Sequence, residues 1–469
     1  MSVIADNRTT ASSRGYLANS GNGPSFVPVD IGHEKYIGLL AADTAFWSLV
    51  KKEQLSQVLS EGSSLIGEYI AHERAFAEEM ETLRFGLKPS AVYFNPTERC
   101  NLNCSYCYIP ADMRRSGVHM RTDRLLDALD RLRTYLGKNV PDHRRPEVIF
   151  HGAEPMLNRE AVFEGIETFG ADFNFGIQTN ATLLDDSAIS FLRRHNVGIG
   201  LSLDGHEATV TDATRKNWTN ERGVHDQVML AIEKLKGYER FNVICTATAQ
   251  NMKFLPQIVT LLHQMNVETC MLNPVRCTLP GARDVKPADH ELSRYYLSAL
   301  EKSVELYEKT GRKLVVANFA NILLGIIAPT ARRLMCDISP CGGGRCFFAV
   351  APNGDLFPCS EFIGLPQFCG GNLFADSIDD VLKSEPFRKV SERNVDTFTP
   401  CKSCAVRHFC GSPCPAEAHE MNGGMNAPGA FCELYEHQVR YALRLIADAR
   451  HSAFLFDNWE KDAQTIFQI

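Results

Sequence analysis

The chain has 469 residues, of which 44% are apolar and 22% charged. This composition supplies enough apolar surface for the cores of two or three domains, and it excludes an extended disordered chain. The net charge is −7, with acidic and basic residues mixed along the whole length, which argues against nucleic acid or an anionic membrane as a partner. Sixteen cysteines are the unusual feature, because ten of them lie between Cys336 and Cys432.

The N-terminal segment, residues 1–24, is polar and rich in Ser, Thr, Asn and Gly, so we expect a flexible tail there. It lacks the apolar core of a secretory signal, which predicts a cytoplasmic protein. Clustered cysteines in a large cytoplasmic chain bind metal more often than they form disulfides. Residues 26–50 are mostly apolar and predict two short strands and the start of a helix. We therefore expect residues 25–88 to form a small α/β unit.

From residue 89 to residue 275, apolar segments alternate with amphipathic stretches, which predicts an α/β fold with a parallel sheet or barrel. The six strand candidates are residues 91–96, 147–152, 174–180, 197–205, 241–250 and 269–275. Polar clusters follow four of these strands, at residues 97–107, 151–155, 179–182 and 202–205. Functional side chains of parallel α/β folds gather at the carboxyl ends of the strands, so these clusters predict one common site.

Three cysteines come after the first strand with the spacing C-x3-C-x2-C, at Cys100, Cys104 and Cys107. Three thiolates on one loop can bind three irons of a [4Fe–4S] cluster, which leaves the fourth iron open for another ligand. An open coordination position is typical of a catalytic metal centre. A zinc site that lacks its fourth ligand is the alternative that this motif alone leaves open.

The motif resembles the radical S-adenosylmethionine superfamily, and the resemblance extends from about Ala91 to Cys432. It implies a partial (β/α)6 TIM-like barrel in which the cluster of Cys100, Cys104 and Cys107 binds S-adenosylmethionine and cleaves it reductively. The resulting 5′-deoxyadenosyl radical abstracts a hydrogen atom from the substrate. The resemblance also implies an electron donor such as flavodoxin or ferredoxin.

Further motifs match this family in the same order along the chain. HGAEP at residues 151–155 resembles the family's GGEP, whose backbone meets the methionine amino group, with Ala153 in place of the second glycine. That contact requires dihedral angles at Ala153 that alanine can adopt. Taken alone, Asp204 is equally typical of a turn and Arg215 of a surface ion pair, although Arg215 matches an arginine that binds the cofactor carboxylate. The resemblance implies seven cofactor-binding residues: Tyr106, Gly152, Glu154, Asn180, Ser202, Asp204 and Arg215.

After residue 275 the alternation gives way to a bridging helical region, residues 276–335. Its periodicity predicts a long helix at about residues 290–310. Residues 314–331 are uncharged and long enough to approach a bilayer span, but they contain Asn318, Asn321, Gly325 and Pro329. We therefore expect a buried strand and helix there, and no membrane association. Helical periodicity returns near the end of the chain, where residues 436–469 predict a helix followed by a tail.

Residues 336–435 contain the second group of cysteines. The segment CKSCAVRHFCGSPC has the spacing C-x2-C-x5-C-x3-C, and CGGGRCFFAVAPNGDLFPC precedes it with an NGD hairpin turn. Both segments resemble the SPASM extension of radical S-adenosylmethionine enzymes, which holds two auxiliary [4Fe–4S] clusters and would bring the total to three. Zinc bound by cysteine pairs is the alternative.

The resemblance assigns ligands to each auxiliary cluster. For the first it implies Cys341, Cys359 and Cys414, with Cys346 as the expected fourth ligand; without Cys346, one iron would be open to a substrate. For the second it implies Cys401, Cys404, Cys410 and Cys432.

Enzymes with this extension mostly modify peptides or proteins, so the resemblance implies such a substrate, whose gene we expect nearby. Residues 25–88 occupy the place of the leader-recognition domain of many peptide maturases, and an N-terminal cap is the alternative. In the anaerobic sulfatase-maturating enzymes an aspartate base follows the cysteine that matches Cys359, whereas here Ser360 and then Glu361 stand there. A serine hydroxyl cannot accept a proton without help. This favours a thioether or other crosslink over formylglycine formation, with Glu361 as the one candidate acid or base.

Two other functions compete with peptide maturation. A radical S-adenosylmethionine dehydrogenase of a small molecule would keep the same cofactors with a different substrate. A zinc-stabilised binding protein on an α/β scaffold would have no enzymatic activity.

Overall fold

The structure is a computed structural model, and it describes residues 26–60, 63–141, 143–219, 223–411, 414–457 and 459–462. The predicted tail of residues 1–24 therefore lies outside the described residues. None of the helices in these ranges is both long and apolar enough to cross a membrane.

Six parallel strands lie side by side in chain order and form the wall of a partial barrel. They are β4 (Ala91–Phe94), β5 (Glu147–Phe150), β6 (Asn174–Thr179), β7 (Gly198–Ser202), β8 (Phe241–Ala247) and β9 (Thr269–Pro274). All six coincide with the predicted strand segments. The predicted α/β class with a partial barrel is thus confirmed.

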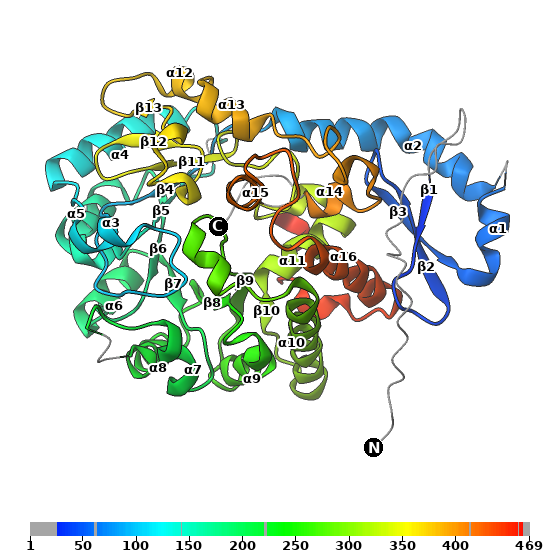
Figure 1. The fold of residues 1–469 in the computed structure, drawn as a ribbon, viewed down its shortest axis with the longest axis horizontal. Coiled ribbons are helices and arrows are strands. Elements are labelled where there is room, and N and C mark those ends of the chain that lie inside the picture. Colours follow the sequence, from blue (N-terminus) through cyan, green and yellow to red (C-terminus); the bar gives the residue numbers. More distant parts are fainter. Residues whose placement is uncertain are drawn as a thin grey trace.

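The helices between these strands cover the outer face of the sheet (Figure 1). They are α3 (Ala111–Ser116), α4 (Thr122–Leu136), α5 (Arg159–Phe169), α6 (Asp186–Arg194), α7 (Ala208–Thr214), α8 (His225–Lys234) and α9 (Leu255–Gln264). In α4, Leu125, Leu129, Leu132 and Leu136 recur at helical spacing and are fully buried. This apolar stripe packs against the sheet and α5, whereas the arginines and aspartates of α4 remain on the surface.

The cysteine-rich segment continues the same sheet beyond the barrel. Strand β11 (Phe347–Val350) pairs in parallel with β4, and β12 (Asp355–Phe357) and β13 (Gly371–Asn372) follow in antiparallel order. The predicted NGD turn joins β11 to β12, and its Gly354 has a φ of +92° that favours glycine. The SPASM-like segment is therefore joined to the barrel by backbone hydrogen bonds.

The bridging region contains α10 (Asp289–Thr310), β10 (Val315–Val316) and α11 (Ala317–Ile327). The uncharged segment is buried as a strand and a helix, as predicted, because β10 pairs with β9 and α11 packs against α16 (Cys432–Ala447). Four shorter helices complete the C-terminal part: α12 (Ile378–Leu382), α13 (Glu385–Ser391), α14 (Arg407–Cys410) and α15 (Pro415–Asn422).

Residues 26–81 form a separate antiparallel sheet followed by helices: β1 (Phe26–Val29), β2 (Tyr36–Ala41), β3 (Phe46–Lys51), α1 (Leu55–Val58) and α2 (Ser64–Glu81). Two strands were predicted where three occur. The apolar run of β3 was interpreted as the start of a helix, but it pairs with β2 along six residues. The sheet lies beside α16 and α11 (Figure 1), where the Trp47 indole donates to the Ile326 carbonyl at 2.7 Å.

Candidate functional site

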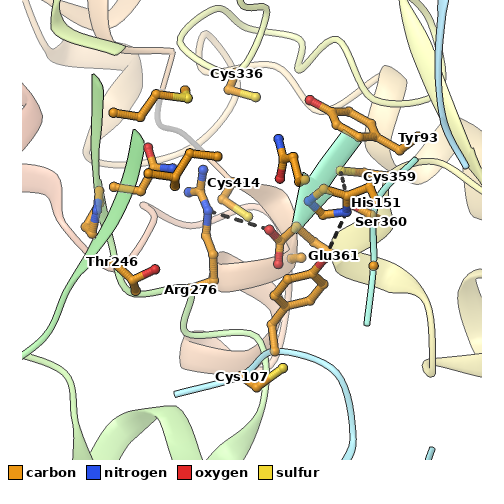
Figure 2. A pocket seen from close by; sticks show the side chains of 18 of the residues that line it. Tyr93, Cys107, His151, Thr246, Arg276, Cys336, Cys359, Ser360, Glu361 and Cys414 are labelled. Carbon is orange, nitrogen blue, oxygen red and sulfur yellow. Dashed lines mark hydrogen bonds and ion pairs between the residues drawn. The ribbon is translucent and has the colours of Figure 1, made fainter. Parts of the chain in front are cut away.

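A cavity of about 320 Å³ lies at the carboxyl ends of the barrel strands, between the barrel and the cysteine-rich segment. Its lining includes cysteines from both groups: Cys100, Cys104 and Cys107 from the loop after β4, and Cys336, Cys341, Cys359 and Cys414 from the C-terminal part. In the view of Figure 2, Cys107 lies at one end, and Cys336 and Cys359 lie at the other. The fold therefore brings two cysteine groups that are more than 200 residues apart to one space.

The loop with the first three cysteines is held by Arg114, which is buried and also lines the cavity, and by Trp218. The Arg114 guanidinium donates to the carbonyls of Leu102 and Ile109, and the Trp218 indole donates to the Cys100 carbonyl at 2.8 Å. Burial, reinforced by neighbouring Glu154, raises the pKa of Cys100 to about 12. A buried thiol of this kind stays protonated unless a bound metal replaces the proton.

The backbone after β5 passes close to the cavity. Gly152 has a φ of +87°, and a Cβ there would lie 2.2 Å from the Asn95 amide nitrogen, so only glycine fits. Ala153 has no positive φ, which meets the condition that alanine can adopt the required backbone. Both residues line the cavity. The backbone of HGAEP is thus free to meet a ligand there.

Glu154 is buried, is not among the residues that line the cavity, and joins two strand ends. Its buried carboxylate accepts hydrogen bonds from the Met156 amide at 3.0 Å, the Thr179 hydroxyl at 2.8 Å and the Asn180 amide at 2.8 Å. Burial raises its pKa, and these three donors oppose the rise. Glu154 therefore fixes the ends of β5 and β6, so that Gly152 and Asn180 face the same space.

Tyr106, Asp204 and Arg215 form a buried network beside the cysteine loop. The Tyr106 hydroxyl hydrogen-bonds both Asp204 and Arg215, and Asp204 also accepts from the Thr246 amide at 2.9 Å. Arg215 lines the cavity, and its buried Nε has no hydrogen-bond partner among the described residues. That unsatisfied donor fits an anionic ligand such as a carboxylate.

The seven predicted cofactor residues have different places relative to the cavity. Those that line it are Tyr106, Gly152, Asn180, Ser202 and Arg215. Asn180 also points its amide at the Cys100 sulfur, 3.8 Å away. Glu154 and Asp204 are fully buried behind this lining and hold its members in place.

Cys346, the expected fourth ligand of the first auxiliary cluster, and Cys336, which had no assigned role, lie in different places relative to the cavity. Cys346 is fully buried at the start of β11, where its carbonyl accepts from the Ser90 amide, and it does not line the cavity. Cys336 lines the cavity, and besides burial the neighbouring Cys341 and Cys359 raise its pKa. The two cysteines lie at equal intervals from Cys341, one on each side, so spacing alone could not distinguish them.

Cys401, Cys404, Cys410 and Cys432 lie away from the cavity, near the contact of α14 with α16. Arg393 lies between the two C-terminal cysteine groups, because it interacts electrostatically with Cys341 and Cys414 of one and Cys401 and Cys410 of the other. Its guanidinium donates to the Met425 and Ala427 carbonyls. In the described residues, no three His, Cys, Asp or Glu side chains converge on a single-ion site.

Glu361 is a carboxylate of the cavity wall. It lies 3.6 Å from Arg276, which is also 3.6 Å from Glu417, and the Glu361 Oε2 atom has no hydrogen-bond partner in the described residues (Figure 2). Burial raises the pKa of Glu361 to about 7, and Arg276 opposes that rise. The cavity thus offers a carboxylate oxygen that a substrate donor could bind.

Among the polar residues of the lining that were not singled out from the sequence are Arg276 and His151. Arg276 directly follows the predicted sixth strand, so the same strand-end rule would have found it. His151 stacks on Tyr108, with its Nδ1 3.1 Å from the Tyr108 hydroxyl, and burial lowers its pKa to about 4. The imidazole is therefore neutral near pH 7.

Comparisons with known proteins agree with the motifs. Residues 94–249 match the radical SAM superfamily, and residues 341–405 match SPASM, an iron–sulfur cluster-binding domain. An uncharacterised protein of Archaeoglobus fulgidus is 39% identical over 408 residues, which cover 87% of this chain and 92% of that protein. A cysteine-type anaerobic sulfatase-maturating enzyme of Clostridium perfringens is 22% identical, over 77% of this chain and 98% of the enzyme.

Solved structures share the fold. The structure of anSMEcpe with bound AdoMet superimposes with a TM-score of 0.69 at 18% identity, over 80% of this chain and 98% of that one. Streptococcus suis SuiB bound to its precursor peptide SuiA gives a TM-score of 0.53 at 13% identity, over 87% of this chain and 100% of that one. The chain belongs to the radical S-adenosylmethionine superfamily and carries a SPASM domain.

Proposed function

We propose that this protein is a maturase that abstracts a hydrogen atom from a peptide or protein and installs a thioether or another crosslink. The observation that carries the proposal is the shared cavity, because one cysteine group faces the other across a space of about 320 Å³. Cysteines on both sides suit a reaction that begins at one iron–sulfur centre and gives up an electron near another. When bound, the clusters and S-adenosylmethionine supply this radical and redox chemistry.

Three [4Fe–4S] clusters account for the cysteine groups. Cys100, Cys104 and Cys107 hold the first and leave one iron for S-adenosylmethionine. Cys336, Cys341, Cys359 and Cys414 hold the first auxiliary cluster, with Cys336 in the role that the sequence analysis gave to Cys346. Cys401, Cys404, Cys410 and Cys432 hold the second. The first two assignments are supported by the cavity lining, which brings together Cys100, Cys104 and Cys107 on one side and Cys336, Cys341, Cys359 and Cys414 on the other.

The chain's own residues orient S-adenosylmethionine at the open iron. Arg215 Nε would bind the cofactor carboxylate, and the backbone of Gly152 and Ala153 would bind the amino group. Asn180 and Ser202 complete the lining on the strand ends. Tyr106 and Asp204 fix the Arg215 guanidinium through its terminal nitrogen, and its Nε has no hydrogen-bond partner among the described residues.

A peptide substrate is supported by the neighbours, because SuiB was solved with a precursor peptide and anSMEcpe with the Cp18Cys peptide. In this chain Glu361 Oε2 binds a donor group of the substrate beside Cys359, held in place by Arg276. The three-stranded sheet of the N-terminal unit leaves β1 and β3 as edges, to either of which a leader peptide could add a strand. We propose that the reaction takes place in the cytoplasm.

Formylglycine formation is the second candidate, favoured by the sulfatase-maturating relatives that this chain matches over nearly their whole length. Ser360 argues against it, because it takes the place of the aspartate that serves as base in those enzymes. Glu361, one residue further on, would have to replace that aspartate. The product therefore distinguishes the two reactions.

The test is coexpression with the short peptides encoded beside the gene, followed by mass spectrometry of each peptide. If a crosslink forms, the mass of the peptide should fall by two hydrogens. Fragmentation should then fail to separate the two linked residues. A formylglycine at one cysteine or serine would support the second candidate instead. Unmodified peptides, together with hydrogen transfer from an added small alcohol to 5′-deoxyadenosine, would contradict both and favour a small-molecule dehydrogenase.

A further inference from the structure

The outer side of the first cysteine loop carries a surface that the site above does not use. We call Arg99, Arg115, Lys216 and Trp218 the cationic rim. Arg99 and Arg115 are exposed, and Lys216 and Trp218 are half-buried. The Trp218 ring lies 6.0 Å from the Arg115 guanidinium carbon, which brings α3 and the segment after α7 together.

The cationic rim is separated from the cysteine loop by a single layer of chain. The Asn103 amide donates to the Lys216 carbonyl at 2.7 Å, and the Ser105 amide donates to the Thr214 carbonyl at 3.1 Å. The Trp218 indole reaches the Cys100 carbonyl directly, at 2.8 Å. No other element intervenes along these hydrogen bonds, so a protein that docks on the rim approaches the loop of the radical centre closely.

None of Arg99, Arg115 and Lys216 forms an ion pair with an acid among the described residues, whereas nearby Arg121 pairs with Asp123 at 2.8 Å. The whole chain carries a net charge of −7. Val118, 50% exposed, adds an apolar contact on the same loop-and-helix segment.

We propose that the cationic rim is the docking surface of an acidic one-electron carrier protein that reduces the centre held by Cys100, Cys104 and Cys107. The inference rests on the proposed function, which requires this reduction. One electron leaves the carrier and enters the centre, and no bond or proton is transferred. Opposite charges align the two proteins and speed their encounter, an effect that salt weakens.

The test measures reduction of the reconstituted holoenzyme by reduced flavodoxin in an anaerobic stopped-flow instrument at several salt concentrations. The variant is R115E/K216E. Both residues are on the surface, neither lines the cavity, and neither side chain takes part in a backbone hydrogen bond among the described residues. The matched control is K35E/R74E, which makes the same charge change in the N-terminal unit, at the opposite end of the molecule in Figure 1. Reduction of the radical centre is identified by the electron paramagnetic resonance signal that changes when S-adenosylmethionine is added.

We expect R115E/K216E to lower the second-order rate constant by about tenfold or more at low salt and to flatten its salt dependence, and K35E/R74E to change it by less than about twofold. Equal rates in the two variants, or an equal loss in both, would overturn the proposal. Photoreduced deazaflavin, a small reductant, should reduce all forms at the same rate. If the radical chemistry of the proposed function fails, the wild type will not cleave S-adenosylmethionine even with deazaflavin, so this failure is distinguishable from a failure of docking.

Discussion

At the residue scale, the flanking cysteines of Cys341 show how backbone direction decides the role of a side chain. Cys346 enters β11, whose neighbour β4 draws it into the core of the sheet. Cys336 precedes the loop that turns toward the cavity and lies near Cys341 and Cys359. Equal sequence intervals therefore lead to unequal positions, and only the pairing of β11 with β4 distinguishes them.

This difference predicts the iron content of two single variants. On the proposed assignment, Cys336→Ala removes one of four ligands of the first auxiliary cluster and weakens it, so we expect the anaerobically reconstituted protein to hold fewer than the about twelve irons per chain of the wild type, with a loss of up to about four. Cys346→Ala removes a core thiol and should keep about twelve irons, with a lower melting temperature. The measurement is iron and sulfide per chain. A loss of iron confined to the Cys346 variant would restore the assignment made from the sequence.

Glu147, which lies away from the cysteines, predicts that the stability of the protein depends on pH. Burial at the start of β5 raises its pKa from 4.5 to about 7, although Asn174 donates to its carboxylate at 2.9 Å. The folded state therefore holds the proton more tightly than the unfolded state. The stability from this proton is fully present below about pH 4.5 and is lost as pH rises through 7. The shift corresponds to roughly 3 kcal/mol at most.

Glu147→Gln removes this dependence, because the amide stays neutral and its oxygen can still accept from Asn174. We expect the free energy of unfolding of the variant to exceed that of the wild type by up to about 3 kcal/mol at pH 8, with the difference shrinking toward pH 5. Urea unfolding at both pH values measures it. Parallel pH profiles for the two proteins would show that Glu147 is not held protonated.

At the element scale, the six barrel strands could be predicted because each is a short apolar run followed by a polar cluster. The parallel pairing of β11 with β4 could not, since it joins segments more than 250 residues apart and depends on tertiary packing. Strand β3 was missed because an apolar run such as AFWSLV has no clear period. The apolar pattern predicted the strand ends, and with them most of the cavity lining. It could not predict that Glu154 and Asp204 are buried behind this lining.

The turn after β5 provides a prediction about an element. Gly152→Ala places a methyl group 2.2 Å from the Asn95 amide at a positive φ, so the loop must move. We expect S-adenosylmethionine affinity to fall by about tenfold or more and stability by about 1–3 kcal/mol. Ala153→Gly is the matched control, because it restores the family's GGEP and should keep affinity within about threefold. Equilibrium dialysis of the reconstituted proteins measures both, and equal affinities would contradict the role of this turn.

At the scale of the whole molecule, one sheet of ten strands joins the barrel to the cysteine-rich segment. The N-terminal unit is attached to the same C-terminal part by ion pairs: Asp43 of the β2–β3 turn contacts Arg407, and Arg84 lies 2.8 Å from Asp396. Arg407 and Asp396 also pair with each other at 2.9 Å. The barrel and the cysteine-rich segment, which carry the two cysteine groups, are therefore held in fixed positions on either side of the cavity.

The central claim is that Cys100, Cys104 and Cys107 form the centre that cleaves S-adenosylmethionine. Its most direct test is 5′-deoxyadenosine formation by the anaerobically reconstituted protein with a small photoreductant. The wild type should form 5′-deoxyadenosine, and the variant with all three cysteines replaced by alanine should form none while keeping about eight of about twelve irons. Formation of 5′-deoxyadenosine by that variant, or a wild type that binds zinc in place of iron and forms none, would contradict the account.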